Sequence, residues 1–189
     1  MVSRVGDTSL KRAVFLDRDG VLVQTNVVNG KPVAVRSLAE MVLLGGAKEA
    51  VKKLKKQGFV TIIVTNQPEI ARGRLDPEEH RRMTEWLVEA LDVDLVETCP
   101  HDDKDNCDCR KPKPGMLRNA AKKLDLSLTN SYMIGDRWRD VVAGKAAGVR
   151  TILIDCSYDE QAPVGTDADA DLVVDRIGAA AEAIVRGDV

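Results

Sequence analysis

The chain has few aromatic residues, little net charge and no long apolar run. Phe, Trp and Tyr make up 3% of 189 residues, which are too few for a platform that stacks the bases of single-stranded nucleic acid. A formal net charge of −2 gives no basic surface for a phosphate backbone. No stretch approaches the roughly 20 apolar residues of a membrane span, and residues 1–11 contain no apolar signal segment. We therefore expect a cytoplasmic protein that binds neither nucleic acid nor a membrane.

The composition is typical of one folded domain. Hydrophobic residues make up 44% of the chain and charged residues 31%, so a packed core can form beneath a charged surface. A chain of 189 residues buries enough apolar surface to fold without disulfides. We expect a monomer with a single domain over residues 1–189, in which 1–11 form a tail.

Short apolar runs alternate with amphipathic segments along the whole chain. Apolar and β-branched runs predict strands at 13–16, 59–64, 94–98, 132–134, 150–154 and 172–174. Amphipathic spacing and capping residues predict helices at 47–57, 77–91, 116–124, 140–147 and in an alanine-rich stretch that ends at 186. The alternation predicts a three-layer, Rossmann-like α/β fold with a parallel sheet.

Two segments lack a regular period. Residues 22–40 contain the turn signal Asn29-Gly30-Lys31-Pro32 between valine-rich flanks, which predicts a hairpin or flap. Residues 155–169 are small and acidic, which predicts a surface loop. Cys156 stands apart from the other cysteines, and we expect a buried thiol there.

Polar side chains follow three of the predicted strands. Asp17 and Asp19 come after the first strand, residues 65–67 after the second, and Asp136 after the fourth. The carboxyl ends of parallel strands lie at one edge of a sheet, so the three carboxylates would repel one another without a cation. Mg²⁺, which prefers a few carboxylates and a substrate phosphate, is the expected ion. The alternative is an ordinary solvated turn after each strand.

A second group of metal-binding residues lies in one loop, residues 99–109. Cys99, His101, Cys107 and Cys109 fall within eleven residues, which is the ligand set and spacing of a closed zinc site. Four protein ligands leave no open position on the ion, so Zn²⁺ would act as a structural staple. The alternative is four reduced side chains without metal.

Four short motifs occur in a fixed order along the chain. They are Asp17-x-Asp19-Gly-Val, Thr65-Asn66, Lys111-Pro and Gly135-Asp136-x3-Asp140. This order resembles the four motifs of the haloacid dehalogenase superfamily of phosphotransferases. Each motif alone is weak, but four in order at strand ends are specific.

The resemblance implies a role for each matching residue. Asp17 would be the nucleophile that forms an aspartyl-phosphate, and Asp19 the general acid and base. Thr65 and Lys111 would hold the transferring phosphoryl oxygens. Asp136 would complete a Mg²⁺ shell with the first two carboxylates. For Asp140 a steadying role at the site and simple solvation on a helix face are both open.

The zinc loop also carries a narrower resemblance. Together with Cys-Arg-Lys-Pro-x-Pro-Gly and Asn66-Gln67-x3-Ala71-Arg72-Gly73, it is similar to the branch that contains heptose bisphosphate phosphatases and histidinol phosphatases. The resemblance covers residues 15–149. It implies a Mg²⁺-dependent phosphatase of a small phosphorylated metabolite, with heptose 1,7-bisphosphate at its 7-phosphate as the first candidate and histidinol phosphate as the alternative.

Substrate contacts are expected from residues outside the four motifs. The resemblance implies contacts from Arg110 and Arg137, and from the amides Asn66 and Gln67. From Asp19 to Thr65 and from Thr65 to Lys111 there are 45 intervening residues each, which one helix, one strand and a loop use up, so no separate cap domain fits. Selection would then come from the flap and the zinc loop, and Arg72, Arg110 and Arg137 are candidates for a second phosphate.

The chain also departs from this branch. Pro68 and Glu69 stand where relatives often have Ser and Gly, Val23 where they have Asn, and Arg137 where they have Lys. These changes leave the phosphoryl-transfer residues untouched and concern the leaving alcohol. Two hypotheses of another class are a signalling domain that keeps its phospho-Asp and a zinc-stapled binding module with an inactive site.

Overall fold

The computed structural model describes residues 10–189, so most of the predicted tail lies outside the described residues. At Lys11 the structure differs from that prediction, because this residue bridges to Leu126 and donates its backbone N–H to the Asp125 carbonyl at 3.1 Å. In residues 10–189, no helix combines the length and apolar content that crossing a bilayer requires.

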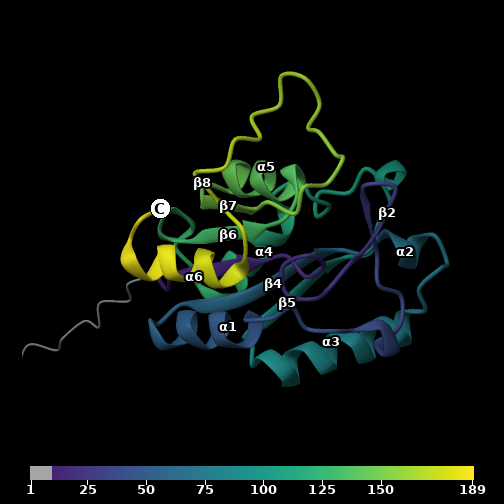
Figure 1. Ribbon diagram of the computed structural model, residues 1–189, viewed down its shortest axis with the longest axis horizontal. Helices are drawn as coiled ribbons and strands as arrows, with labels where there is room; N and C mark the ends of the chain where they lie inside the picture. Colours follow the sequence, from purple (N-terminus) through teal and green to yellow (C-terminus); the bar gives the residue numbers. More distant parts are fainter. Residues whose placement is uncertain (1–9) are drawn as a thin grey trace, which may run out of the picture.

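A six-stranded parallel sheet forms the middle layer, as the alternating pattern predicts (Figure 1). Its order is β5-β4-β1-β6-β7-β8. The strands are β1 (Ala13–Leu16), β4 (Val60–Asn66), β5 (Leu95–Cys99), β6 (Tyr132–Gly135), β7 (Arg150–Ile154) and β8 (Leu172–Val174). The central strand β1 is fully buried, because helices cover both faces of the sheet.

Helices form the two outer layers. On one face lie α1 (Ala47–Lys56), α3 (Pro77–Leu91) and α6 (Ile177–Arg186), and on the other α4 (Gly115–Leu124) and α5 (Trp138–Ala147). Alternate β1 residues point to opposite faces, so Val14 packs in the first core and Phe15 in the second. The three-layer α/β prediction is therefore confirmed.

Three short segments outside the main sheet surround its carboxyl edge: a hairpin, a short helix and a loop. The predicted flap is a two-stranded hairpin, β2 (Asn26–Val28) and β3 (Lys31–Val33), and β4 is followed by the short helix α2 (Pro68–Ala71). Residues 155–170 form the expected loop without helix or strand. Its Asp159 backbone N–H donates to the Gly30 carbonyl at 2.8 Å, so the loop contacts the tip of the hairpin.

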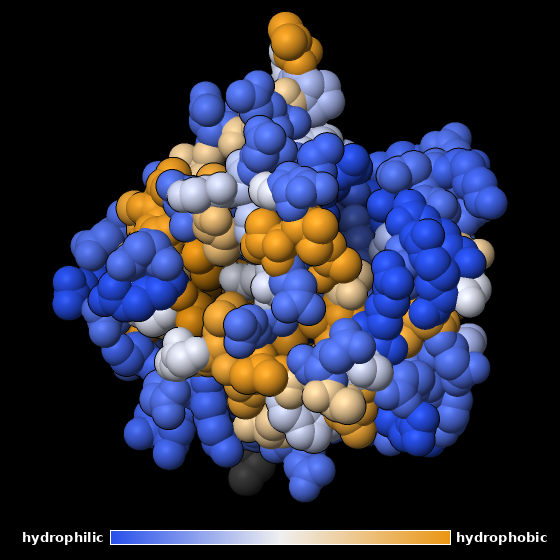
Figure 2. All heavy atoms as spheres, turned by 45° about the vertical axis from the view of Figure 1, so that its right-hand side comes forward, coloured by the Kyte–Doolittle hydropathy of each residue, from blue (hydrophilic) through white to orange (hydrophobic). Residues whose placement is uncertain are grey.

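Hydrophilic side chains dominate much of the surface. On the face shown in Figure 2, they cover the right-hand side, and hydrophobic residues gather in patches toward the centre and left. Among exposed apolar residues, Val27 and Val28 lie on the hairpin. The hairpin thus presents valines outward, while its other end leads into the segment that borders the site.

Candidate active site

Two neighbouring strands deliver carboxylates to the same point of the sheet edge. Asp17 follows β1 and Asp136 follows β6, and the Asp17 backbone N–H donates to the Ile134 carbonyl at 2.9 Å. Gly20 turns the chain after β1 with φ +83°, and a Cβ there would lie 1.9 Å from Asp136 Oδ2. Only glycine therefore allows the turn after β1 to approach the Asp136 carboxylate this closely.

Three buried carboxylates meet at this edge around one lysine. Asp17, Asp136 and Asp140 offer oxygens that all lie within 4.8 Å of one another, and we call them the carboxylate cluster. The Lys111 Nζ lies 2.8 Å from Asp17 Oδ1 and 2.5 Å from Asp140 Oδ1. It also donates to the Val64 carbonyl at 2.8 Å. One ammonium group thus faces three carboxylates, and negative charge is in excess.

This excess shifts the protonation of the cluster. Burial, with Asp17 and Asp140 as negative neighbours, raises the pKa of Asp136 well above its ordinary value. Burial also raises the pKa of Asp140 to about 6, although Lys111 opposes the shift. Burial alone would lower the pKa of Lys111, but its two carboxylates hold it above the ordinary value. The lysine stays charged, and the surplus carboxylates need a further cation or a proton.

The cluster has the donors that a hard divalent cation prefers. Both carboxylate oxygens of Asp136 are buried, and within the described part of the chain no hydrogen bond of good geometry reaches them, although the Tyr158 hydroxyl lies close by. Buried carboxylate oxygens without a donor are costly unless a cation meets them. Carboxylate oxygens from a few residues are the ligands that Mg²⁺ takes, so the donor set fits that ion.

Asp19 lies in the same cavity but not in the carboxylate cluster. The guanidinium of Arg18 holds its carboxylate in a fork with contacts of 2.8 to 3.1 Å. Gln67 Nε2 donates a further hydrogen bond to Asp19 Oδ2 at 3.0 Å. The sequence places Asp19 with the metal ligands, whereas here its side chain turns toward these two partners.

The residues that follow β4 divide between the cavity and its support. Thr65 is buried, lines the cavity and accepts a hydrogen bond from Gln67 Nε2 at 2.9 Å. Asn66 also lines the cavity, but its amide group pairs with the backbone N–H and carbonyl of Lys111, both at 3.0 Å. Gln67 is fully buried and lies behind Asp19. These amides therefore position Lys111 and Asp19.

The structure settles the two interpretations of Asp140. Its side chain is 2% exposed, and it accepts a hydrogen bond from the Arg137 backbone N–H at 3.1 Å in the first turn of α5. A Cβ on Gly135 would lie 2.1 Å from the Asp140 Cβ, so the glycine makes room for this carboxylate. Solvation on a helix face is therefore wrong, and Asp140 holds Lys111 in place.

A cavity of about 420 Å³ opens above the carboxylate cluster and reaches the flap. Asp17, Asp19, Thr65 and Lys111 lie on its walls. Six arginines also line it, namely Arg36, Arg72, Arg74, Arg110, Arg137 and Arg139. A cavity with carboxylates at one part and guanidinium groups at another can hold a metal ion and a multiply charged anion together.

The three arginines predicted from the sequence are all ion-paired. Arg72 forks onto Asp102 with contacts of 2.6 and 2.8 Å. Arg110 pairs with Asp103 at 2.8 Å and donates to the His101 carbonyl at 3.3 Å. Arg137 forms two contacts of 2.6 Å with Glu160 on the 155–169 loop. Their positions are therefore set by carboxylates on the surrounding loops.

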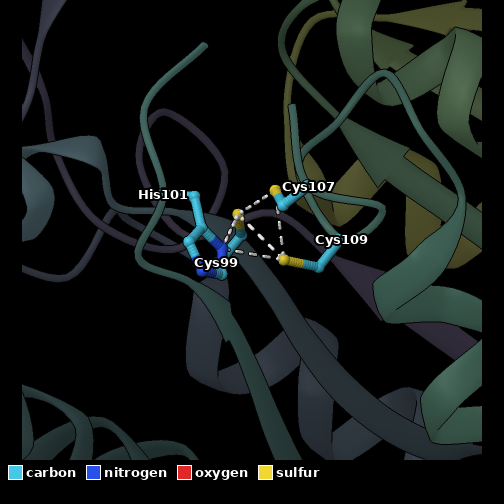
Figure 3. A group of neighbouring side chains, drawn as sticks. All are labelled: Cys99, His101, Cys107 and Cys109. Carbon is cyan, nitrogen blue, oxygen red and sulfur yellow. Dashed lines mark hydrogen bonds between the residues drawn. The ribbon is translucent and has the colours of Figure 1, made fainter. Parts of the chain in front are cut away.

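The four residues of the zinc loop converge as their spacing predicts (Figure 3). Cys99 Sγ lies 3.1 Å from Cys109 Sγ and 3.6 Å from Cys107 Sγ, and His101 Nδ1 lies 3.3 Å from Cys109 Sγ. Burial raises the pKa of the Cys99 thiol far above its ordinary value, so a cation is needed to remove its proton. Three thiols and an imidazole at this spacing fit a tetrahedral Zn²⁺.

Several residues at the site were not predicted from the sequence. Arg18 is fully buried against Asp19, and Arg36, Arg74 and Arg139 line the cavity. The position of Arg18 between two candidate catalytic aspartates could have indicated a role at the site. An arginine in an irregular segment, such as Arg36, gives no such indication in the sequence. The prediction for Cys156 is also wrong: this residue is half-buried rather than buried, because it lies on the irregular 155–169 loop at the surface.

Comparisons with known proteins agree with this geometry. Residues 108–180 match the HAD-hydrolase-like family model. The chain is 37% identical to the D-glycero-β-D-manno-heptose-1,7-bisphosphate 7-phosphatase of Photorhabdus laumondii, over 91% of this chain and 94% of that relative. It is 38% identical to the phosphatase of the same name from Pasteurella multocida, over 77% of this chain and 82% of the relative.

A solved structure shares both fold and extent. It is the D,D-heptose 1,7-bisphosphate phosphatase of B. bronchiseptica complexed with magnesium and phosphate, with a TM-score of 0.77 and 29% identity. The match covers 93% of this chain and 99% of that one. The chain therefore belongs to the haloacid dehalogenase superfamily, in the family of the D-glycero-D-manno-heptose 1,7-bisphosphate 7-phosphatases.

Proposed function

We propose that the protein is a magnesium-dependent phosphatase that removes the 7-phosphate of D-glycero-D-manno-heptose 1,7-bisphosphate. The observation that carries the proposal is the arrangement of Asp17, Asp19 and Lys111 in one arginine-lined cavity. The names of its relatives support the heptose substrate and give no support to histidinol phosphate. The bisphosphate also carries a second anionic group for the arginines.

Asp17 would attack the phosphorus in the first half-reaction. Its carboxylate oxygen forms the new bond, and the bond from phosphorus to the sugar oxygen breaks. Asp19 would give its proton to that oxygen, so the sugar leaves as a neutral alcohol. In this structure Arg18 and Gln67 donate hydrogen bonds to the Asp19 carboxylate. The Asp19 side chain therefore has to rotate away from these two partners to reach the leaving oxygen.

Water would complete the second half-reaction. Asp19, now a carboxylate, accepts a proton from water as the water oxygen attacks the phosphorus. The bond from phosphorus to Asp17 breaks, and inorganic phosphate leaves. Thr65 and Lys111 would donate hydrogen bonds to the phosphoryl oxygens in both steps. These donors would stabilise the negative charge on the phosphoryl oxygens in the transition state.

The two metals would have separate tasks. Asp17 and Asp136 would hold Mg²⁺, which offsets the charge of the carboxylates and of the substrate phosphate. The four ligands of the zinc loop would hold Zn²⁺ and thereby fix Arg110 at the cavity wall, since Arg110 directly follows Cys109.

A single domain over 1–189, a monomeric state and a cytoplasmic location stay predictions.

Phosphate release from defined substrates tests the proposal. Purified protein with Mg²⁺ should hydrolyse the heptose 1,7-bisphosphate and leave histidinol phosphate largely intact. Asp17→Asn should lower kcat by about 10⁴-fold, because the nucleophile is lost. Activity of this variant within tenfold of the unchanged chain, or no hydrolysis of the bisphosphate by the unchanged chain, would contradict the proposal.

A further inference from the structure

A buried carboxylate stands among three arginines on the wall of the cavity. The Glu69 side chain is 5% exposed and lies in α2. Arg74 forks onto it with two contacts of 2.7 Å, and Arg72 and Arg36 each contact it at 3.0 Å. We call Glu69 and these three residues the arginine clamp.

The clamp joins segments that are far apart in the chain. Arg36 follows the hairpin strand β3, and Arg74 follows α2. The hydrogen bond from Arg74 lowers the pKa of Glu69, against the effect of burial, so the carboxylate stays ionised. A single fixed negative charge thus holds the guanidinium groups of the flap segment and of the α2 segment at one place.

The three arginines differ in how many donors remain free for a ligand. A guanidinium has five N–H donors. Arg72 divides its donors between Glu69 and Asp102. Arg74 has Glu69 as its side-chain partner, and the side chain of Arg36 makes one contact to the same carboxylate, within residues 10–189. Arg36 and Arg74 therefore keep the most donors unused.

Arg36 and Arg74 also face the cavity in which the substrate would bind. Their side chains are 44% and 50% exposed, and both line the cavity that contains Asp17. By contrast, Arg110 and Arg137 direct their forks at Asp103 and Glu160. Forked guanidinium donors suit the oxygens of a phosphate, and a fixed anchor reduces the entropy lost when they bind it.

We propose that Arg36 and Arg74, positioned by Glu69, form an anion subsite for the phosphate that is not hydrolysed. The inference rests on the proposed function, because it assumes that another phosphate reacts at Asp17. It adds two arginines on the flap side of the cavity to Arg72, Arg110 and Arg137, which the sequence favours for the second phosphate. The ligand class is a small sugar with two phosphates.

Kinetics with a matched pair of substrates test the subsite. The pair is the heptose 1,7-bisphosphate and the same heptose carrying the 7-phosphate alone, so that the reacting group is identical. The quantity compared is the ratio of kcat/KM for the two substrates. Arg36→Gln and Arg74→Gln should each lower this ratio about tenfold, through a higher KM for the bisphosphate, as expected for the loss of one charge-assisted contact.

Two further variants serve as controls. Arg81→Gln removes an arginine of similar exposure that pairs with Glu78 and Glu85 on α3, away from the cavity, and should leave the ratio unchanged. Arg74→Lys keeps the charge but loses the fork, so its ratio should lie between those of the unchanged chain and Arg74→Gln.

The outcomes separate this inference from the proposed function. If the unchanged chain prefers the bisphosphate and both glutamine variants keep that preference, the subsite is wrong and the proposed function stands. If the unchanged chain hydrolyses both substrates equally well, the cavity has no second-phosphate subsite and the inference is wrong. If it hydrolyses neither, the proposed function fails and the inference fails with it.

Discussion

The carboxylate cluster and the arginine clamp line the same cavity with opposite charge balance. In the cluster one lysine faces three carboxylates, whereas in the clamp one carboxylate faces three guanidinium groups. The cluster is buried at strand ends, and the arginines of the clamp are a third to a half exposed on irregular segments. The sheet thus fixes the groups that react, and the loops supply charge that a substrate can contact.

Of the changes that test this comparison, removal of the Lys111 ammonium group should have the largest effect on stability. Lys111→Met leaves the buried carboxylates without their cation, so the free energy of unfolding in Mg²⁺-free buffer at pH 7 should fall by about 3 to 5 kcal/mol. Denaturant titration measures it. Mg²⁺ should restore part of the loss, because it replaces the missing positive charge. A fall of less than about 1 kcal/mol would mean that the ion pairs contribute little.

Zinc removal should act on the arginine side of the cavity. A chelator that strips Zn²⁺ should disorder the zinc loop, since structural zinc supplies the folding energy of such loops. Arg110 then loses its contact to the His101 carbonyl, and KM for the bisphosphate should rise about tenfold while kcat changes less. Metal analysis should find about one zinc per chain. A zinc-free protein with unchanged KM would show that the loop does not position substrate contacts.

The two regions should respond to pH with opposite sign. The folded state raises the pKa of Asp140 from 3.8 to about 6, so it binds a proton more tightly than the unfolded state does. Between about pH 4 and 6 this carboxyl therefore lowers stability as pH rises, by on the order of 3 kcal/mol. Glu69 has a lowered pKa, so its contribution is complete above about pH 4.5 and is lost as pH falls below it.

Matched variants separate these contributions. Denaturant titrations in Mg²⁺-free buffer from pH 3 to 7 should show that Asp140→Asn removes part of the fall in stability between pH 4 and 6. Glu69→Gln should instead remove part of the loss below pH 4.5, and it should lower stability at neutral pH because its arginines lose their partner. Identical pH profiles for both variants would contradict the opposite shifts.

Two members of the carboxylate cluster, Asp17 and Asp136, were predictable from the sequence because few physical rules decide their place. Apolar runs fix the strands, and parallel strands place Asp17 and Asp136 at one edge. The zinc loop was predictable for a similar reason, since its four ligands are close in the chain. The family motifs then supplied Thr65 and Lys111, which the structure brings to the same cavity.

The arginine clamp was not predictable, because its members come from segments without a periodic pattern. Arg36 and Glu69 are 33 positions apart in the sequence, and only the docking of the flap on α2 brings them together. The direction of the site's side chains was also not predictable from the sequence. The Asp19 side chain turns toward Arg18, and Gln67 is buried behind Asp19. Rotamer preferences and packing decide these directions.

Cys109, Arg110 and Lys111 are consecutive in the chain, yet one belongs to the zinc loop, one to the cavity wall and one to the carboxylate cluster. One inserted or deleted residue here would shift at least one of the three from its place. This stretch of the gene should therefore accept no change of length during evolution.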